Sequence, residues 1–412
     1  MKSWLRFSLF ISSLLILAAC GSRELLSKAS IVPAMISPNA DGVADATQIH
    51  YELSRKATVS ITFTDINGQA YYFRRDQTRA AGVYDVLFGG VIDGKLLPDG
   101  VYTWTINADG TTAQGQLTID GGEKVAPQIT LLTVFPKEFT PNRDGISDRT
   151  TINVVLNKPA TLFTTLQNSL CNGSETPPPD NPTLDCSSFP LTEKEGAGRK
   201  PGEEGLHVYD YDAGVDLGAD PPPDGTYIVT SRVEDNVGQV AVATDTLKIV
   251  DGGVPRAEIV DGTVDYSKSA VLVGDTLYFT LTVENYGAVP IRTSGPLSGY
   301  VYQDIDETYN AAGYATESGV WRVGIDFETS KRNYPFRWAV GGVDDLMVKE
   351  IEGVKYYYLP AGKRATITGG IHITAAQPRR DVVFWAGLIH EDVEISSINN
   401  NVDPQPITIE QP

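Results

Sequence analysis

Cysteine and histidine are scarce in this sequence of 412 residues, which contains three cysteines and four histidines. Only Cys171 and Cys186 lie beyond the N-terminal region, and neither has a neighbouring histidine that could form a metal site or an activated nucleophile with it. The sequence also lacks a nucleophile elbow, a zinc-binding helix and a phosphate-cradling glycine loop. These absences predict a protein that is not an enzyme.

Positive charge is in the minority. The chain carries 33 lysines and arginines against 52 aspartates and glutamates, for a net charge of −19. The negative electrostatic potential of such a chain repels polyanions, which argues against nucleic acid and against anionic lipid headgroups as direct ligands.

Long apolar runs are absent except near the N-terminus, where residues 7–17 are apolar but too few to span a bilayer. They follow the basic Lys2 and Arg6, as in a secretory leader. The stretch Leu17-Ala18-Ala19-Cys20 resembles the lipobox of bacterial lipoproteins. The resemblance implies a signal peptide over residues 1–19, lipid attachment at Cys20 and an extracytoplasmic place in the cell envelope. An ordinary secretory leader with a chance cysteine is the alternative.

Long helical periodicity is missing, whereas glycine (39) and proline (25) are plentiful. Apolar residues alternate with polar ones at Ile49, Tyr51 and Leu53, and again over residues 59–63, as in half-buried strands. Many short alternating segments separated by turn signals predict an all-β fold of sandwich domains.

One stretch occurs twice, at residues 37–45 (Ser-Pro-Asn-Ala-Asp-Gly-Val-Ala-Asp) and 140–148 (Thr-Pro-Asn-Arg-Asp-Gly-Ile-Ser-Asp). A Pro-Asp-Gly-x-Tyr segment recurs at 98–102 and 223–227, and each unit closes on Asp-Gly-Gly. The offset is larger at the second landmark, which indicates an insertion between Gln167 and Gly205. A repeat on this scale marks where domains begin.

These motifs resemble the Ig-like domain of the flagellar hook-cap scaffolding protein, which implies two spacer or scaffold domains. Residues 282–287 (Thr-Val-Glu-Asn-Tyr-Gly), with Asn399-Asn400-Asn401 before a last strand, resemble the bacterial cell-adhesion-related domain. That likeness implies a third Ig-like sandwich. We therefore expect three tandem Ig-like β-sandwich domains after the lipoprotein signal peptide: a lipidated tether at 20–29, domain 1 at 30–122, domain 2 at 123–253 and an adhesion-type domain at 254–412.

Cys171 and Cys186 both lie in the insertion of the second domain. An even pair in an exported chain predicts a disulfide. Closing a loop of about 15 residues would stabilise the domain by roughly 3 kcal/mol.

The repeated stretch is also a candidate calcium site, because Ca²⁺ prefers oxygen ligands and its loops place a glycine between them. The candidate ligands are the amide and carboxylate side chains of the two copies, namely Asn39, Asp41, Asp45, Asn142, Asp144 and Asp148. The alternative is a turn in which these side chains cap their own backbone while glycine supplies a positive φ.

Tyr356, Tyr357 and Tyr358 are consecutive on an expected strand, so they cannot all face the core. They form a candidate ligand-binding platform for sugars, with an ordinary core plus one interface residue as the alternative.

The sequence as a whole predicts a lipid-anchored structural or interaction protein of the cell surface, in which a rod of sandwiches presents a distal binding domain. Its expected partners are the membrane, through the lipid, and either surface proteins or cell-envelope polysaccharide. The alternative function is carbohydrate binding by a surface lipoprotein that assists polysaccharide capture. Apart from Ca²⁺, no cofactor is expected.

Overall fold

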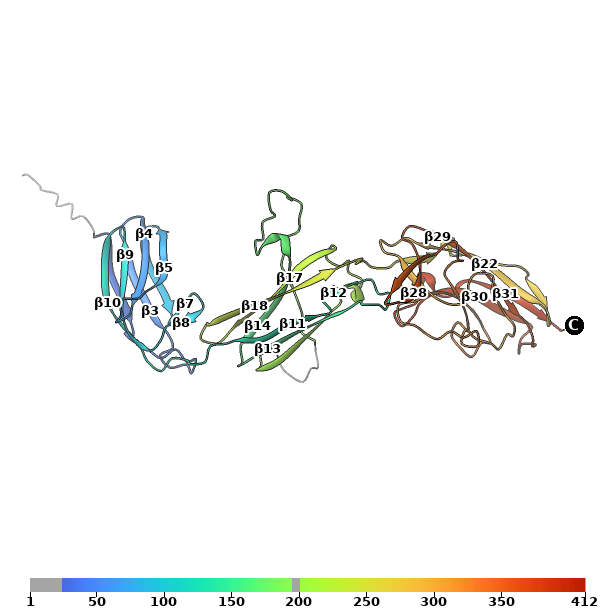
Figure 1. Cartoon of the computed structure of the whole chain (residues 1–412), viewed down its shortest axis with the longest axis horizontal. Helices are drawn as coiled ribbons and strands as arrows, with labels where there is room; N and C mark the ends of the chain where they lie inside the picture. The colour runs from blue at the N-terminus through green and yellow to red at the C-terminus, as the bar shows by residue number, and fades with distance from the viewer. Residues whose placement is uncertain (1–23, 195–200, 412) are drawn as a thin grey trace, which may run out of the picture. The chain divides into compact units, whose positions relative to one another are not determined.

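The computed structural model describes residues 24–194 and 201–411, and these residues form strands joined by loops and short 3-10 turns. The expected all-β fold class is confirmed. The predicted signal peptide and Cys20 lie outside the described residues. The chain forms two compact units: the first runs up to Pro127 and also includes Glu234–Ala241, and the second comprises Gln128–Val233 and Val242–Pro412. Among the described residues, no strand before residue 120 pairs with one after 128, and no strand before 250 pairs with one after 256. The strands therefore form three separate sets of sheets (Figure 1).

The first sandwich has a three-stranded and a five-stranded sheet. The three-stranded sheet has the order β1 (Leu26–Val32), β3 (Thr47–Leu53), β6 (Gly82–Phe88). The five-stranded sheet has the order β2 (Met35–Ile36), β10 (Thr111–Ile119), β9 (Gly100–Ala108), β4 (Ala57–Thr64), β5 (Ala70–Arg79). A small hairpin of β7 (Val91–Ile92) and β8 (Lys95–Leu96) follows β6.

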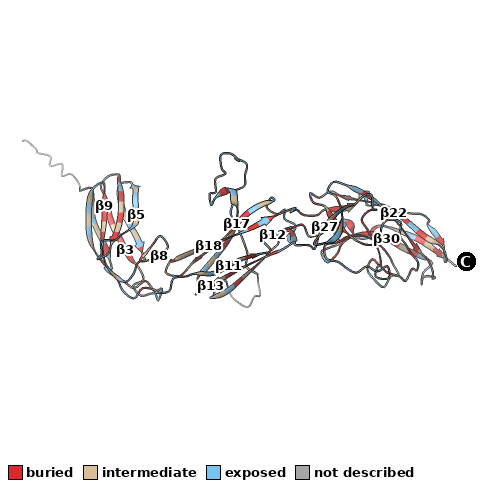
Figure 2. Cartoon of the chain, viewed as in Figure 1, coloured by how far each residue is buried: buried red, intermediate tan, exposed pale blue. Residues whose placement is uncertain are grey.

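The alternating residues of the first sandwich point into one core. Ile49, Tyr51 and Leu53 are buried, and every second residue of β4 is buried as well. Buried residues recur along the strands of this sandwich (Figure 2). Phe63 of the five-stranded sheet stacks on Phe88 of the three-stranded sheet, with ring centroids 4.3 Å apart. The two sheets therefore pack face to face, as the period-two pattern predicts.

The second sandwich repeats this topology. One sheet has the order β11 (Ile129–Phe135), β13 (Thr150–Leu156), β16 (Gly205–Tyr211). The other has the order β12 (Glu138–Phe139), β18 (Val240–Ile249), β17 (Gly225–Glu234), β14 (Thr161–Asn168), β15 (Phe189–Pro190). The short strand before the repeated stretch pairs in parallel with the last strand in both copies, β2 with β10 and β12 with β18.

The insertion in the second copy lies between β14 and β16, where the sequence offset placed it. It contains a 3-10 turn (Ser169–Cys171), strand β15 and the disulfide between Cys171 and Cys186. The predicted disulfide is therefore confirmed. Gln167 donates through its side-chain amide to the carbonyl of Cys186 (2.9 Å), which fixes the insertion to β14.

The third sandwich is larger. Its first sheet has the order β19 (Ala257–Ile259), β22 (Thr276–Asn285), β29 (Arg364–His372), β24 (Val301–Tyr302), with β20 (Asp265–Tyr266) also paired to β22. Its second sheet has the order β21 (Ala270–Leu272), β31 (Val402–Glu410), β30 (Asp381–His390), β25 (Trp321–Phe327), β23 (Ile291–Thr293), β28 (Val354–Leu359), β27 (Met347–Ile351), with β26 (Phe336–Ala339) paired to β25.

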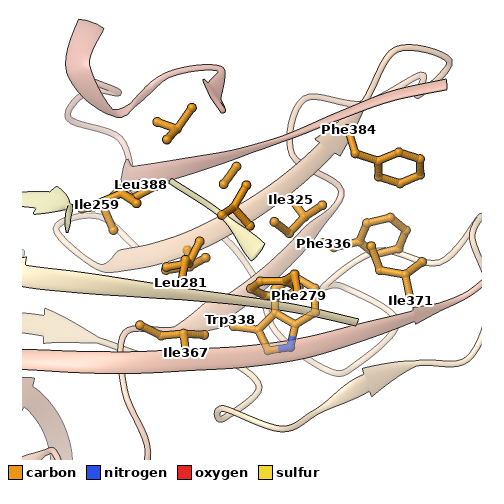
Figure 3. Close-up of a cluster of buried hydrophobic side chains, with 14 of the residues drawn as sticks. Ile259, Phe279, Leu281, Ile325, Phe336, Trp338, Ile367, Ile371, Phe384 and Leu388 are labelled. Carbon is orange, nitrogen blue, oxygen red and sulfur yellow. The ribbon is translucent and has the colours of Figure 1, made fainter. Parts of the chain in front are cut away.

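Aliphatic and aromatic side chains together form the core of the third sandwich (Figure 3). Phe279 of the first sheet meets Trp338 of the second in an edge-to-face contact at 4.7 Å. Trp338 also contacts Tyr302, again edge to face, at 5.1 Å. Phe279, Tyr302 and Trp338 are therefore core residues of this domain. The predicted domain limits stay predictions, because one compact unit holds the third sandwich together with most of the second.

Candidate functional site

The first copy of the repeated stretch forms a turn closed by its own side chains. Asp45 accepts the backbone N–H of Asn39 (3.1 Å) and Gly42 (2.7 Å), and Asn39 accepts that of Asp41 (3.0 Å). Desolvation acts to raise the pKa of Asp45, but the backbone hydrogen bonds outweigh it and hold that pKa below its usual value. Gly42 has a φ of 86°, which favours glycine.

The same three hydrogen bonds recur in the second copy. Asp148 accepts the N–H of Asn142 (3.4 Å) and Gly145 (2.6 Å), and Asn142 accepts that of Asp144 (3.1 Å). These bonds are the ones that the turn interpretation predicts. A cation would have to share oxygens that already accept backbone N–H groups. Calcium at either loop therefore stays a prediction, and no three His, Cys, Asp or Glu side chains cluster in metal-binding fashion among the described residues.

The two copies of the repeated stretch differ in how far their side chains are buried. Asp41 is exposed in the first copy, whereas Asn142 and Asp144 are 5% and 7% exposed in the second. Asp144 is covered by Tyr358 of β28, which is 1% exposed and donates its hydroxyl hydrogen to Asp144 Oδ2 at 3.0 Å. Both residues belong to the compact unit that begins at Gln128. The second loop is thus a joint between the second and third sandwiches, and we call this contact the buried joint.

The backbone of the buried joint is close-packed. A Cβ at Gly145 would lie 2.1 Å from the carbonyl oxygen of Ser318, and one at Gly319 would lie 2.2 Å from the carbonyl carbon of Asp144. Both glycines have φ near +80°, so glycine is required here by space and by conformation. Arg292 donates to the Ser318 carbonyl at 2.6 Å and so holds this segment against the loop.

A buried histidine completes the joint. His390 Nε2 lies 2.9 Å from the carbonyl oxygen of Arg143, so the proton of the neutral ring is on Nε2. The ring stacks on Trp321 with centroids 4.4 Å apart. Burial lowers the pKa of His390 to about 4. Burial and the nearby Asp144 carboxylate together raise the pKa of Asp148 to about 6. Burial raises the pKa of Asp144 as well.

The three consecutive tyrosines point in different directions, as the alternation of a strand requires. Tyr358 is buried in the joint and Tyr356 is half-buried beside the guanidinium of Arg292. Only Tyr357 is freely accessible, at 43% exposure. The sugar-binding role of Tyr356, Tyr357 and Tyr358 stays a prediction, but their side chains do not form one continuous platform.

Tyr357 lines a pocket of about 260 Å³ on the third sandwich, which we call the tyrosine pocket. Its apolar wall consists of Leu297, Tyr314, Val343 and Leu346, and Thr293, Ser294, Gly295 and Ala339 complete the lining. The sequence interpretation missed these residues, except for Tyr357. Most lie in loops, where no periodic pattern marks a residue that will meet others in space.

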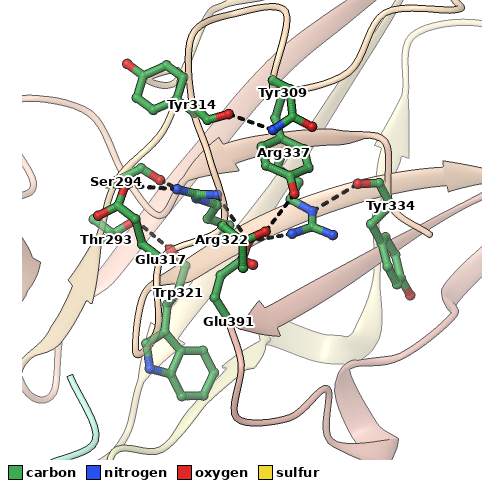
Figure 4. Close-up of polar contacts among 12 residues, drawn as sticks. Thr293, Ser294, Tyr309, Tyr314, Glu317, Trp321, Arg322, Tyr334, Arg337 and Glu391 are labelled. Atoms are coloured by element: carbon green, nitrogen blue, oxygen red, sulfur yellow. Dashed lines mark hydrogen bonds and ion pairs between the residues drawn. The ribbon is translucent and has the colours of Figure 1, made fainter. Parts of the chain in front are cut away.

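A buried charge network supports this pocket (Figure 4). Glu391, 3% exposed, accepts from the fully buried Arg322 (3.2 Å) and from Arg337 (2.6 Å). Arg322 also donates through Nε to the carbonyl of Ser294 (2.8 Å) and through its terminal nitrogen to the Ser294 hydroxyl (3.0 Å). Burying an arginine is costly unless its hydrogen bonds are satisfied, so this network fixes the pocket wall at Ser294.

The same network reaches the buried joint. The backbone of Glu391 donates to the carbonyl of Val320 (2.8 Å) and accepts from Gly319 (3.0 Å), the glycine that lies against Asp144. The tyrosine pocket and the joint are therefore connected through one set of buried hydrogen bonds.

No helix in the described part of the chain is long and apolar enough to cross a membrane. No protein-family model matches the chain, and no curated protein matches it.

Several solved structures align with the chain at low similarity. The bacterial integrin-binding protein invasin is 12% identical over 94% of this chain and 60% of its own, with a TM-score of 0.18. The N-terminal eight Ig domains of Down syndrome cell adhesion molecule are 10% identical over 94% of this chain and 48% of their own, with a TM-score of 0.22. Salmonella alpha-2-macroglobulin reacted with methylamine is 12% identical, with a TM-score of 0.21, and the chain covers only 23% of it. Similarity at this level identifies neither a family nor a function.

Proposed function

We propose that this chain is a lipid-anchored structural and interaction protein of the cell surface, and that its third sandwich contacts a partner through the tyrosine pocket. The observation that carries this proposal is the accessible Tyr357 beside Leu297, Tyr314 and Val343, on a wall that buried arginine fixes in place. Tyrosine gives a large contact area with little side-chain entropy to lose, which is why it is common in binding surfaces. The two repeated sandwiches act as spacers.

Two further features support a place in the cell envelope, on the extracytoplasmic side. The leader and Cys20 match what lipid attachment requires, and the disulfide in the second sandwich suits an oxidising compartment. Labelling cells with radioactive palmitate tests the anchor: wild-type protein should take up label, and Cys20→Ser should not. Label that persists in the serine variant would refute lipid attachment at this residue.

The tyrosine pocket is tested by capture from intact cells. The chain from residue 20 with Cys20→Ser serves as soluble bait, and crosslinked partners are compared between this protein and a Tyr357→Ala variant. Tyr278→Ala is the matched control, because Tyr278 is 50% exposed on another strand of the same sandwich. Loss of a partner with Tyr357→Ala but not with Tyr278→Ala supports the proposal. Identical partner sets for all three proteins would contradict it.

Carbohydrate binding is the second candidate. Tyr314 and Tyr357 both line the tyrosine pocket, and aromatic rings suit stacking against a sugar ring. A glycan array probed with the soluble chain separates the two functions. Binding that is lost in Tyr357→Ala favours carbohydrate, and silence across the array favours a protein partner.

A further inference from the structure

A basic edge runs along the first sandwich. Strand β5 is the outermost strand of its sheet and carries Arg74, Arg75 and Arg79. Arg74 and Arg75 lie over the rings of Phe73 and Tyr72, at 4.1 and 4.0 Å from their centroids. Aromatic rings hold these guanidinium groups in place without neutralising their charge.

Two more basic residues extend this edge. Arg55 and Lys56 form the exposed turn between β3 and β4, and the next residue, Ala57, pairs with Arg79 at the end of β5. We define the basic edge as Arg55, Lys56, Arg74, Arg75 and Arg79. None of the five forms an ion pair with a carboxylate of residues 24–194 or 201–411.

The acidic side chains nearby only partly offset this charge. Asp76 accepts the hydroxyl of Ser60, Asp109 accepts the backbone N–H of Thr58, and Glu24 is exposed at the start of the described chain. Glu52 of β3 is paired with Lys28 at 2.9 Å and so adds no net charge. The five residues of the basic edge therefore outnumber the carboxylates of Asp76, Asp109 and Glu24. This local excess differs from the net charge of −19 that predicts repulsion from anionic surfaces.

Unlike Asp109, the acidic loop at Asp65 lies at the other end of β4 from Arg55 and Lys56. Asp65 follows the last residue of β4, whereas Arg55 and Lys56 precede the first. An eight-residue strand is roughly 26 Å long at 3.3 Å per residue. Charges in solution are screened beyond about 8 Å at physiological salt, so the distant carboxylates do not cancel the positive potential at the basic edge.

The chain enters the first sandwich at this same end. Leu26 pairs with Leu53, and the N–H of Ser54 donates to the carbonyl of Leu25 at 3.1 Å, directly before Arg55. Cys20 precedes Leu25 by only five residues, and five residues of extended chain reach at most about 18 Å. A lipid on Cys20 would hold the basic edge close to the bilayer surface.

We infer that the basic edge binds the phosphate headgroups of anionic phospholipids in the membrane that carries the anchor. This inference rests on the proposed lipid attachment at Cys20. Arginine matches the geometry of a phosphodiester through paired N–H donors, and tyrosine is favoured at the headgroup level. The lipid and the basic edge together orient the first sandwich on the membrane.

The test removes the anchor so that only the protein surface is measured. The chain from residue 20 with Cys20→Ser is sedimented with vesicles of phosphatidylglycerol mixed equally with phosphatidylcholine, and with vesicles of phosphatidylcholine alone. Each basic residue near an anionic surface contributes about a fivefold gain in binding. Arg55→Gln with Lys56→Gln should therefore weaken binding to the anionic vesicles by about 25-fold, and adding Arg75→Gln should weaken it about fivefold more.

Lys95→Gln with Lys124→Gln is the matched control, because both lysines are exposed in the same compact unit and the change in net charge is equal. The control should bind like the parent chain. Equal losses in the two double variants, or equal binding to both kinds of vesicle, would overturn the inference. Displacement by soluble glycerol phosphate at matched phosphate concentration would also overturn it, because the ligand would then be free phosphate. Palmitate labelling of the wild type reports on the anchor independently of all these outcomes.

Discussion

The hydrogen bond from Tyr358 to Asp144 gives the sharpest test of the buried joint. Tyr358→Phe removes only the hydroxyl and leaves the ring, so it creates no large cavity. The bond is 3.0 Å long, its donor is 1% exposed and its acceptor carboxylate is 7% exposed. Hydrogen bonds to a charged group contribute about 1.5–3 kcal/mol, and an acceptor left unpaired in a buried site loses this in full. We expect Tyr358→Phe to destabilise the second compact unit by about 2 kcal/mol.

Urea unfolding followed by tryptophan fluorescence measures this loss, since Trp321 and Trp338 lie in the affected sandwich. For a unit of this size a loss of about 2 kcal/mol corresponds to a melting temperature lower by about 4–8 °C. A double-mutant cycle with Asp144→Asn isolates the pair, and its coupling energy should be about 1–2 kcal/mol.

The repeat supplies an internal control. Asp41 occupies in the first copy the position that Asp144 occupies in the second, and each accepts the N–H two residues later. Only Asp144 is buried. Asp144→Ala should therefore cost far more stability than Asp41→Ala. Equal costs, or a Tyr358→Phe variant as stable as the parent, would refute the assignment of the second loop as a stabilising joint.

Three further predictions concern charge, pH and the disulfide. Glu391→Gln should lower the free energy of unfolding by about 3–5 kcal/mol, because Arg322 is then buried without a full counter-charge. Glu284→Gln, which affects an exposed ion pair with Arg364, should change it little. Similar small losses in both variants would contradict a stabilising role for the buried charge network. The pKa of His390 is about 4 in the folded protein, so the unfolded chain binds this proton first and the protein loses stability as pH falls from 6.5 to 4. The pKa of Asp148 is about 6, so the folded protein binds that proton first and gains stability over most of the same range. Urea unfolding of Asp148→Asn should therefore lose more stability on acidification than wild type, and parallel pH profiles would refute this compensation. Reducing the disulfide, whose cysteines are 15 residues apart, should cost about 3 kcal/mol, and an unchanged urea midpoint with reductant would contradict that value.

Local patterns in the sequence were sufficient for the sheets. Leu277, Phe279, Leu281 and Val283 alternate with polar residues, and all four are buried in β22, because a half-buried strand must place every second side chain in the core. The repeated stretch likewise predicted two equivalent turns, since short side chains and glycine at fixed spacing determine local hydrogen bonds.

The sequence predicted the strands less well where the pattern was short. Strand β23 (Ile291–Thr293) was not expected, because its three residues are all buried and therefore show no alternation. Strand β27 (Met347–Ile351) was missed as well, since it lies at a sheet edge with no fully buried residue. Edge strands carry weak periodicity because only one neighbour and part of one face constrain them.

By itself, the sequence determined the all-β fold, the duplication with its insertion and the pairing of Cys171 with Cys186. Only the tertiary structure decided that one repeated loop is exposed while the other is buried beneath Tyr358, which is 214 residues away from Asp144. Only the tertiary structure brought Tyr357 together with the loop residues of its pocket. The reason is physical: strand alternation and turn chemistry act between near neighbours and leave a periodic trace, whereas contacts between distant segments depend on how sheets pack and leave none.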